Sequence, residues 1–415
     1  MKEKELQKNG LIVLTLTTFG SALNYLCQII MGRALSVADF GTINTIFSIM
    51  SITSVIGTTL SMLVSKYVAE NLAENKYKEI KEYTYTILSS MGILSALVLL
   101  VGALIVSLLG ISIGLKNGLI IYLTVIVLLI NLFPIFFQGI FGGWQKFVAL
   151  GLYTVIVPVF KLIGTILAQN NLYLVVISLI IANVISTIIG YCIVYITMKG
   201  YEGKYSLSHG VSCFKVEEYY IDSFVVNISM MFLMNIDILY LKIFCDSEVA
   251  GLYSSAILFG RIIYYCVTAL AAVLLPMVSY AEKKQKDTYG MLKQTTVIIL
   301  GLSIMLLVPV NLFAKQILVL VYGSQYYAAV QFVKWASVIS VGTSLNTILV
   351  NYLLGRGNLH YLKKYLLLGV GIIIVLITLL QKRMDIVLLM LGVVLMLIFI
   401  LNYYQIKIEN KRREK

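Results

Sequence analysis

Long apolar segments alternate with short polar ones along the whole chain. Each apolar segment has about 20 residues or more, the length that an α-helix needs to cross the hydrocarbon core of a bilayer. Strands of a membrane β-barrel would instead alternate apolar and polar residues over roughly ten positions. The pattern therefore predicts an all-α polytopic membrane protein with twelve transmembrane helices, at residues 10–31, 40–64, 84–110, 118–140, 147–168, 172–197, 219–244, 249–278, 294–313, 329–354, 362–380 and 385–404.

The positions of Lys and Arg predict the orientation of these helices. If the N-terminus lies inside, 23 of the 32 Lys and Arg residues fall in inside segments, 6 fall outside and 3 fall within spans. Such an excess is typical of cytoplasmic loops. We therefore expect a multi-pass protein with both termini in the cytoplasm. The same distribution accounts for the net charge of +13, so nucleic acid is not expected as a partner.

The two halves of the chain resemble each other. The sequence around Gly41 returns around Gly251, Glu70 returns as Glu282, and GGWQKF at 142–147 has a loose counterpart in GRGNLHY at 355–361, with offsets of 210 to 213 positions. Because six helices is an even number, both halves begin on the same side of the membrane. The pattern predicts two parallel repeats with a cavity between them: an N-terminal six-helix bundle at 1–200, a cytoplasmic linker at 201–218 and a C-terminal six-helix bundle at 219–415.

The polar segments between the spans are short. The longest outside loop is predicted at 314–328. The charged segments 66–83 and 281–293 are predicted either as interfacial helices or as solvated linkers, and the sequence does not separate these alternatives.

Three charged side chains lie well inside predicted spans. A charge at the centre of a spanning helix costs about 2.5–3.5 kcal/mol on insertion scales, so such residues often have a function. At about 1.5 Å per residue, Lys161 lies roughly 20 Å from the inner end of its helix, and Arg261 lies roughly 18 Å from the outer end of its own. We interpret both as a cationic lining for an anionic substrate. The alternative is structural pairing, because Asp237 on the neighbouring helix is within reach of Arg261 and would neutralise it or bind a coupling ion.

Four further polar residues are weaker candidates. Lys334 lies near the outer end of its helix, where it either contributes to substrate binding or extends its ammonium group to the interface. Arg33 is interpreted as an interfacial anchor. Asn24 and Asn235 are candidates for substrate binding, although hydrogen bonding between helices is the simpler explanation for an asparagine within a span.

Sequence motifs for catalysis are missing. The chain has no GxxxxGK[ST] phosphate-binding loop, no HExxH and no CxxC pair. We therefore expect no enzyme activity, no cofactor and no metal site.

Several motifs resemble one family of transporters. GRALSVADFGTINTIFSI with KYVAEN after the second span, FFQGIFGGWQKF before Lys161, and VYGSQYYAAVQFVKWAS with LLGRGN in the second half are similar to Wzx-type polysaccharide flippases of the MOP (multidrug/oligosaccharidyl-lipid/polysaccharide) exporter superfamily. The resemblance implies two six-helix bundles of MATE-like fold, alternating access and a lipid-linked oligosaccharide as substrate. Members use cavity cations for the substrate's pyrophosphate, and Lys161 and Arg261 match that role.

The resemblance implies a bacterial inner-membrane flippase that moves undecaprenyl-pyrophosphate-linked oligosaccharide to the outer leaflet for surface polysaccharide synthesis. A polysaccharide polymerase and glycosyltransferases would be its partners. One alternative is a cation-coupled multidrug exporter of the same fold, but such relatives often have an acidic residue in the first helix, which this chain lacks. An alternative of another class is a membrane polysaccharide polymerase or glycosyltransferase, for which no large outer loop and no DxD motif are present.

Overall fold

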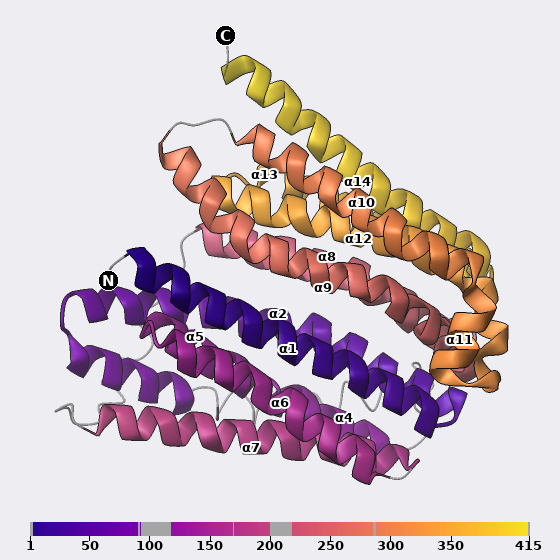
Figure 1. The fold of residues 1–415 in the computed structure, drawn as a ribbon, viewed down its shortest axis with the longest axis horizontal. Helices are drawn as coiled ribbons and strands as arrows, with labels where there is room; N and C mark the ends of the chain where they lie inside the picture. Colours follow the sequence, from indigo (N-terminus) through magenta and orange to yellow (C-terminus); the bar gives the residue numbers. More distant parts are fainter. Residues whose placement is uncertain are drawn as a thin grey trace. The chain divides into compact units, whose positions relative to one another are not determined.

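A computed structural model of the chain describes residues 3–89, 92, 118–168, 170–199, 218–284 and 288–413, and over these residues it is helical with short turns (Figure 1). Nine of the described helices are long and apolar enough to cross a membrane. The helices are α1 (Glu3–Ala34), α2 (Val37–Ala73), α4 (Gly118–Ile130), α5 (Leu132–Gly143), α6 (Phe147–Leu167), α7 (Leu172–Met198), α8 (Glu218–Phe244), α9 (Ser247–Lys283), α10 (Tyr289–Leu312), α11 (Ala314–Tyr322), the 3₁₀ helix η2 (Ser324–Ala329), α12 (Val330–Arg356), α13 (His360–Leu380) and α14 (Met384–Arg413).

The observed helices match eleven of the twelve predicted spans, and the prediction of an all-α membrane protein is confirmed. Residues 77–89 are also helical, but most of the predicted span 84–110 lies outside the described residues. The span predicted at 118–140 is divided into α4 and α5 at Asn131. Pro134, in the first turn of α5, has no N–H to donate to the carbonyl of residue 130, so the regular hydrogen-bond pattern is interrupted there.

Helix boundaries repeat between the two halves of the chain. Both α2 and α9 have 37 residues, and α9 begins and ends 210 positions after α2. Similarly, α6 and α13 each have 21 residues and are offset by 213 positions at both ends. These equal lengths and offsets confirm the internal repeat that the short sequence motifs indicate.

The chain forms two compact units. Unit 1 consists of Met1–Ala34 with Ile49–Tyr220, and unit 2 consists of Leu35–Ser48 with Ile221–Lys415. The first turns of α2 therefore belong to unit 2, although the helix continues without a break into unit 1. The bundle boundaries predicted above do not include this exchange, and they stay a prediction.

Two glycines explain how the first turns of α2 pack within unit 2. A Cβ atom on Gly41 would collide with the carbonyl oxygen of Ser247, and one on Gly251 would collide with the carbonyl oxygen of Val37. The starts of α2 and α9 therefore approach as closely as two helix backbones can, at equivalent positions of the repeat.

Three segments predicted to lie outside the spans are mostly helical. Residues 66–73 continue α2, and residues 281–283 are the last turn of α9, so neither is a separate interfacial helix. The predicted loop at 314–328 forms α11 and η2 instead. Tyr322 and Tyr326 from this segment are buried and pack against Phe40. The aromatic side chains that pack inward here explain why the segment folds.

Candidate functional site

Close packing between α1 and α6 positions the first cation, in unit 1 (Figure 1). A Cβ atom on Gly20 would lie 3.4 Å from the carbonyl oxygen of Thr154 and 3.7 Å from the ring of Pro158. One turn nearer the inner end of the predicted orientation, Gly151 lies directly against Leu16. Later residues of α1 contact later residues of α6, so the two helices run in the same direction. This agrees with the predicted topology, in which they are the first and fifth spans.

Lys161 lies one turn beyond this contact. Its Nζ atom donates a hydrogen bond to Oδ1 of Asn24 at 3.3 Å, and the residue is 8% exposed. On the far side, the Sγ atom of Cys27 lies 3.1 Å from Oγ1 of Thr165, which donates in turn to the carbonyl oxygen of Lys161. The structure therefore brings together Lys161 and Asn24, two residues that the sequence predicted separately.

A second pair of the same kind lies in unit 2, between the hairpin helices α8 and α9. The guanidinium of Arg261 donates to Oδ1 of Asn235 at 3.5 Å. The residue before it, Gly260, allows α9 to pack closely on Ser340 of α12. Asn235 is buried, whereas Arg261 is partly exposed, so the charged group remains accessible to water or to an anionic ligand.

The two asparagines occupy equivalent positions in the repeat. Asn235 follows Asn24 by 211 positions, and α8 is the counterpart of α1. Each amide accepts a hydrogen bond from a cation on another helix, and each donates to a carbonyl one turn back on its own helix, at Gly20 and Met231. In each pair a neutral amide oxygen fixes the position of the cation, and Arg261 is also close enough to Asp237 for the two charges to attract each other.

Asp237 has a hydrogen-bond partner that the sequence did not predict. Its Oδ2 atom accepts a 2.6 Å hydrogen bond from the hydroxyl of Tyr253, and its Oδ1 atom accepts from the backbone N–H of Ile238 at 2.8 Å. Asp237 is 1% exposed, and Arg261 lies near enough for the two charges to attract each other, although the ion pairs found among the described residues do not include a direct contact between them. Tyr253 was not predicted, because an aromatic residue within a span is usually interpreted as an apolar side chain.

The other two candidate cations lie at helix ends. Lys334 is exposed, and its Nζ atom lies 4.5 Å from the centre of the Trp335 ring, which is a cation–π contact. Arg33 is exposed in the last turn of α1. Both positions fit side chains at the membrane interface. The contact of Lys334 with Trp335 does not place it beside Arg261.

Two buried cations were missed by the sequence reasoning because they lie at predicted span ends. Arg356, whose side chain is 4% exposed, pairs with Glu282 of α9 at 3.7 Å and Glu409 of α14 at 3.4 Å. At the opposite ends of the helices, Lys242 is buried and donates to Thr42 and Ser247. Both tie helix ends together within unit 2. Over the part of the chain that the structure describes, no group of acidic, His or Cys side chains could hold a metal ion.

Comparisons with known proteins agree with this architecture. The family model described as "Polysaccharide biosynthesis protein" matches residues 6–282. No curated protein matches significantly by sequence.

Several solved structures are similar in fold. One is the inward-facing conformation of a multidrug resistance MATE family transporter of the MOP superfamily, with 14% identity, 97% of this chain and 99% of that chain covered, and a TM-score of 0.66. A MOP superfamily transporter from Pyrococcus furiosus, whose binding pocket is reported to have reverse polarity, has 13% identity, coverage of 98% and 96%, and the same TM-score of 0.66. At these identities the likeness establishes the fold, which is that of the MOP superfamily.

Proposed function

Since the chain belongs to the polysaccharide biosynthesis protein family and has the fold of MOP superfamily transporters, we propose that it is a flippase for an undecaprenyl-pyrophosphate-linked oligosaccharide. It would carry this lipid from the cytoplasmic to the outer leaflet of a bacterial inner membrane by alternating access. Both termini would lie in the cytoplasm, and the glycosyltransferases and polymerase of the same polysaccharide would act before and after it.

The observation that carries this proposal is the pair of intramembrane cations held by asparagines. Lys161 is placed by Asn24 and Arg261 by Asn235. A pyrophosphate needs cationic hydrogen-bond donors, whereas a sugar head group mainly needs polar side chains without charge. A cation within a spanning helix is costly, and an anionic substrate that binds to it at some stage of the cycle would offset part of this cost.

A drug exporter that takes cationic compounds would need the opposite charge at these positions. Its substrates would be repelled by Lys161 and Arg261. The buried carboxylate of Asp237 is the observation that fits a cation-coupled mechanism, and its hydrogen bond with Tyr253 is compatible with a coupling ion in either kind of transporter.

The test is complementation of a strain that lacks its own polysaccharide flippase. We expect the wild-type protein to restore surface polysaccharide and the double variant Lys161→Ala, Arg261→Ala to fail, although it reaches the membrane in equal amount. Lys382→Ala, which removes an exposed cation between α13 and α14, should behave as the wild type. Full export by the double variant would contradict the proposal.

A further inference from the structure

One face of α13 is open where its counterpart in the other half is covered. In α6, Gly151, Thr154 and Pro158 lie against α1. The offset of 213 positions makes Lys364 and Leu367 the equivalents of Gly151 and Thr154. Gly371 is the equivalent of Pro158, and all three α13 residues are exposed.

The opposite side of α13 is fully used. Leu362, Leu366, Gly369, Ile373 and Ile377 are buried, and Gly369 packs against side chains of α14. Helix α8 contacts α13 at both ends. Near one end Lys363 forms an ion pair with Asp222, and at the other Tyr240 donates to the carbonyl oxygen of Gln381 at 2.6 Å. The open face lies between these two attachments.

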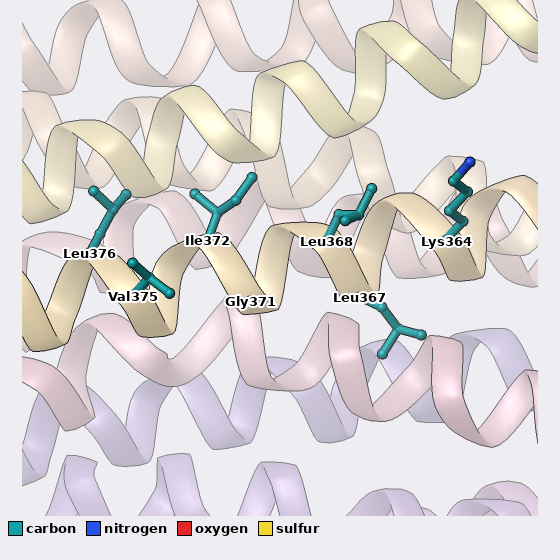
Figure 2. Close-up of a pocket in the computed structure, with 7 residues that line it drawn as sticks. All are labelled: Lys364, Leu367, Leu368, Gly371, Ile372, Val375 and Leu376. Carbon is teal, nitrogen blue, oxygen red and sulfur yellow. The ribbon is translucent and has the colours of Figure 1, made fainter.

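The open face forms a groove of about 660 Å³. Figure 2 shows its lining side chains, all from α13, with Lys364 at one end and Leu376 at the other: Lys364, Leu367, Leu368, Gly371, Ile372, Val375 and Leu376. Residues 364, 368, 372 and 376 form one i, i+4 ridge, and 367, 371 and 375 form the next. Gly371 interrupts the second ridge, and a Cβ atom there would meet nothing within 4 Å.

The charge in the groove is concentrated at one end. Lys364 is exposed and has no hydrogen bond or ion pair to any described residue, while the neighbouring Lys363 is already paired with Asp222. In the predicted orientation Lys364 lies at the cytoplasmic end, at the level of lipid head groups. The rest of the groove is apolar.

We propose that this groove binds an anionic glycerophospholipid of the cytoplasmic leaflet, with its phosphate at Lys364 and one acyl chain along Leu368, Gly371 and Ile372. From Lys364 to Leu376 the helix rises by twelve residue steps, or about 18 Å, close to half of the ~30 Å hydrocarbon core. One leaflet lipid therefore fits the groove from head group to chain end.

The residue types favour a lipid over a helix from a second copy. Helix pairs in membranes pack through small residues, as α1 and α6 do at Gly20 and Gly151. The α13 groove instead has branched aliphatic side chains with one glycine. A polyprenyl chain is much longer than a leaflet, so the substrate's own tail fits this groove less well than a phospholipid chain does.

The test is native mass spectrometry of the full chain, purified from detergent supplemented with equal amounts of phosphatidylglycerol and phosphatidylcholine. We expect the wild type to retain one phosphatidylglycerol that Lys364→Gln loses. Gly371→Leu, which fills the notch without a clash, should lose it as well. Two matched controls should retain it: Gly301→Leu, at an exposed glycine of α10 that also has nothing within 4 Å, and Lys382→Gln.

Four results would overturn the proposal. They are equal retention of both lipids by the wild type, retention of phosphatidylglycerol by Lys364→Gln and Gly371→Leu, loss of the lipid by the two controls, and a wild-type dimer that only these two groove variants dissociate. Added undecaprenyl phosphate provides a further arm. If it displaces the bound phosphatidylglycerol at equal concentration, the groove belongs to a prenyl lipid and the proposal is wrong.

Discussion

Lys161 and Arg261 share one feature of their environments, since each cation lies within a helix predicted to span the membrane and donates a hydrogen bond to a neutral amide oxygen. An amide oxygen fixes the position of a cation without forming an ion pair itself, which suits a site that must bind and release an anion. The two side chains differ in geometry. Lysine presents a compact ammonium group, whereas the arginine fork can donate two parallel hydrogen bonds to one phosphate.

The first prediction concerns this difference. We expect Arg261→Lys to retain part of the transport activity, because it keeps the charge but loses the bidentate grip, and Arg261→Ala to lose most of it. A hydrogen bond from a charged group contributes about 1.5–3 kcal/mol, so the loss of one such bond corresponds to a reduction of the transport rate of roughly ten- to hundredfold. Initial rates of export in cells with matched protein levels would measure this order. Equal export rates for Arg261→Lys and Arg261→Ala would show that a positive charge at this position is not by itself enough to support transport.

The second prediction concerns Tyr253 and Asp237. Tyr253→Phe leaves the buried carboxylate without its side-chain donor, so the free energy of unfolding should fall by about 1–3 kcal/mol. Combining it with Asp237→Leu removes both partners, and the double variant should lose less than the sum of the single losses.

Thermal unfolding in detergent would measure the four proteins of this cycle. Tyr326→Phe is the matched control, because the Tyr326 hydroxyl is buried and has no hydrogen-bond partner among the described residues. It should leave the stability almost unchanged. Strict additivity of the Tyr253 and Asp237 effects would mean that the hydrogen bond contributes nothing.

Among the helices, the apolar pattern was sufficient to predict the positions of the spans, because a bilayer imposes one requirement on every span. It did not predict the full lengths of α1, α2 and α14, which continue beyond their apolar segments. It was not sufficient where tertiary packing decides. Residues 314–329 fold because Tyr322 and Tyr326 pack against Phe40, a contact between segments almost 300 positions apart. The hydrogen bond from Tyr253 to Asp237 was missed for the same reason, because distances along the helices indicated that Arg261 is within reach but not that a tyrosine hydroxyl lies closer.

The third prediction tests the close contact between the starts of α2 and α9. Gly41→Leu should separate the two helices, because its side chain would meet the backbone at Ser247 and Gly251. Overpacking of this kind costs about 1–3 kcal/mol, so we expect a lower unfolding temperature and reduced export. Gly301→Leu has open space around it and should change neither quantity. A Gly41→Leu protein with normal stability and export would show that this contact is dispensable.

For the whole molecule, the distribution of Lys and Arg predicts a single orientation with both termini inside. The fourth prediction is that reporter fusions at Ser206, Lys284 and Lys411 give cytoplasmic signals, whereas those at Ala38, Gln169 and Ser324 give external ones. The physical reason is the 23-to-6 excess of cations on the predicted inner side. An external signal at Lys284 would contradict the twelve-helix topology, because that residue directly follows α9.

The central claim is our proposal that the chain moves a lipid-linked oligosaccharide across the bilayer with the help of Lys161 and Arg261. The most direct measurement is flipping of a fluorescent undecaprenyl-pyrophosphate-linked oligosaccharide in liposomes that contain only the purified protein. We predict that the wild-type protein speeds the movement of labelled head groups between the leaflets, measured as the rate at which they become accessible to an external quencher. The Lys161→Ala, Arg261→Ala variant should lose this acceleration. Equal flipping by empty liposomes, wild type and double variant would contradict the account.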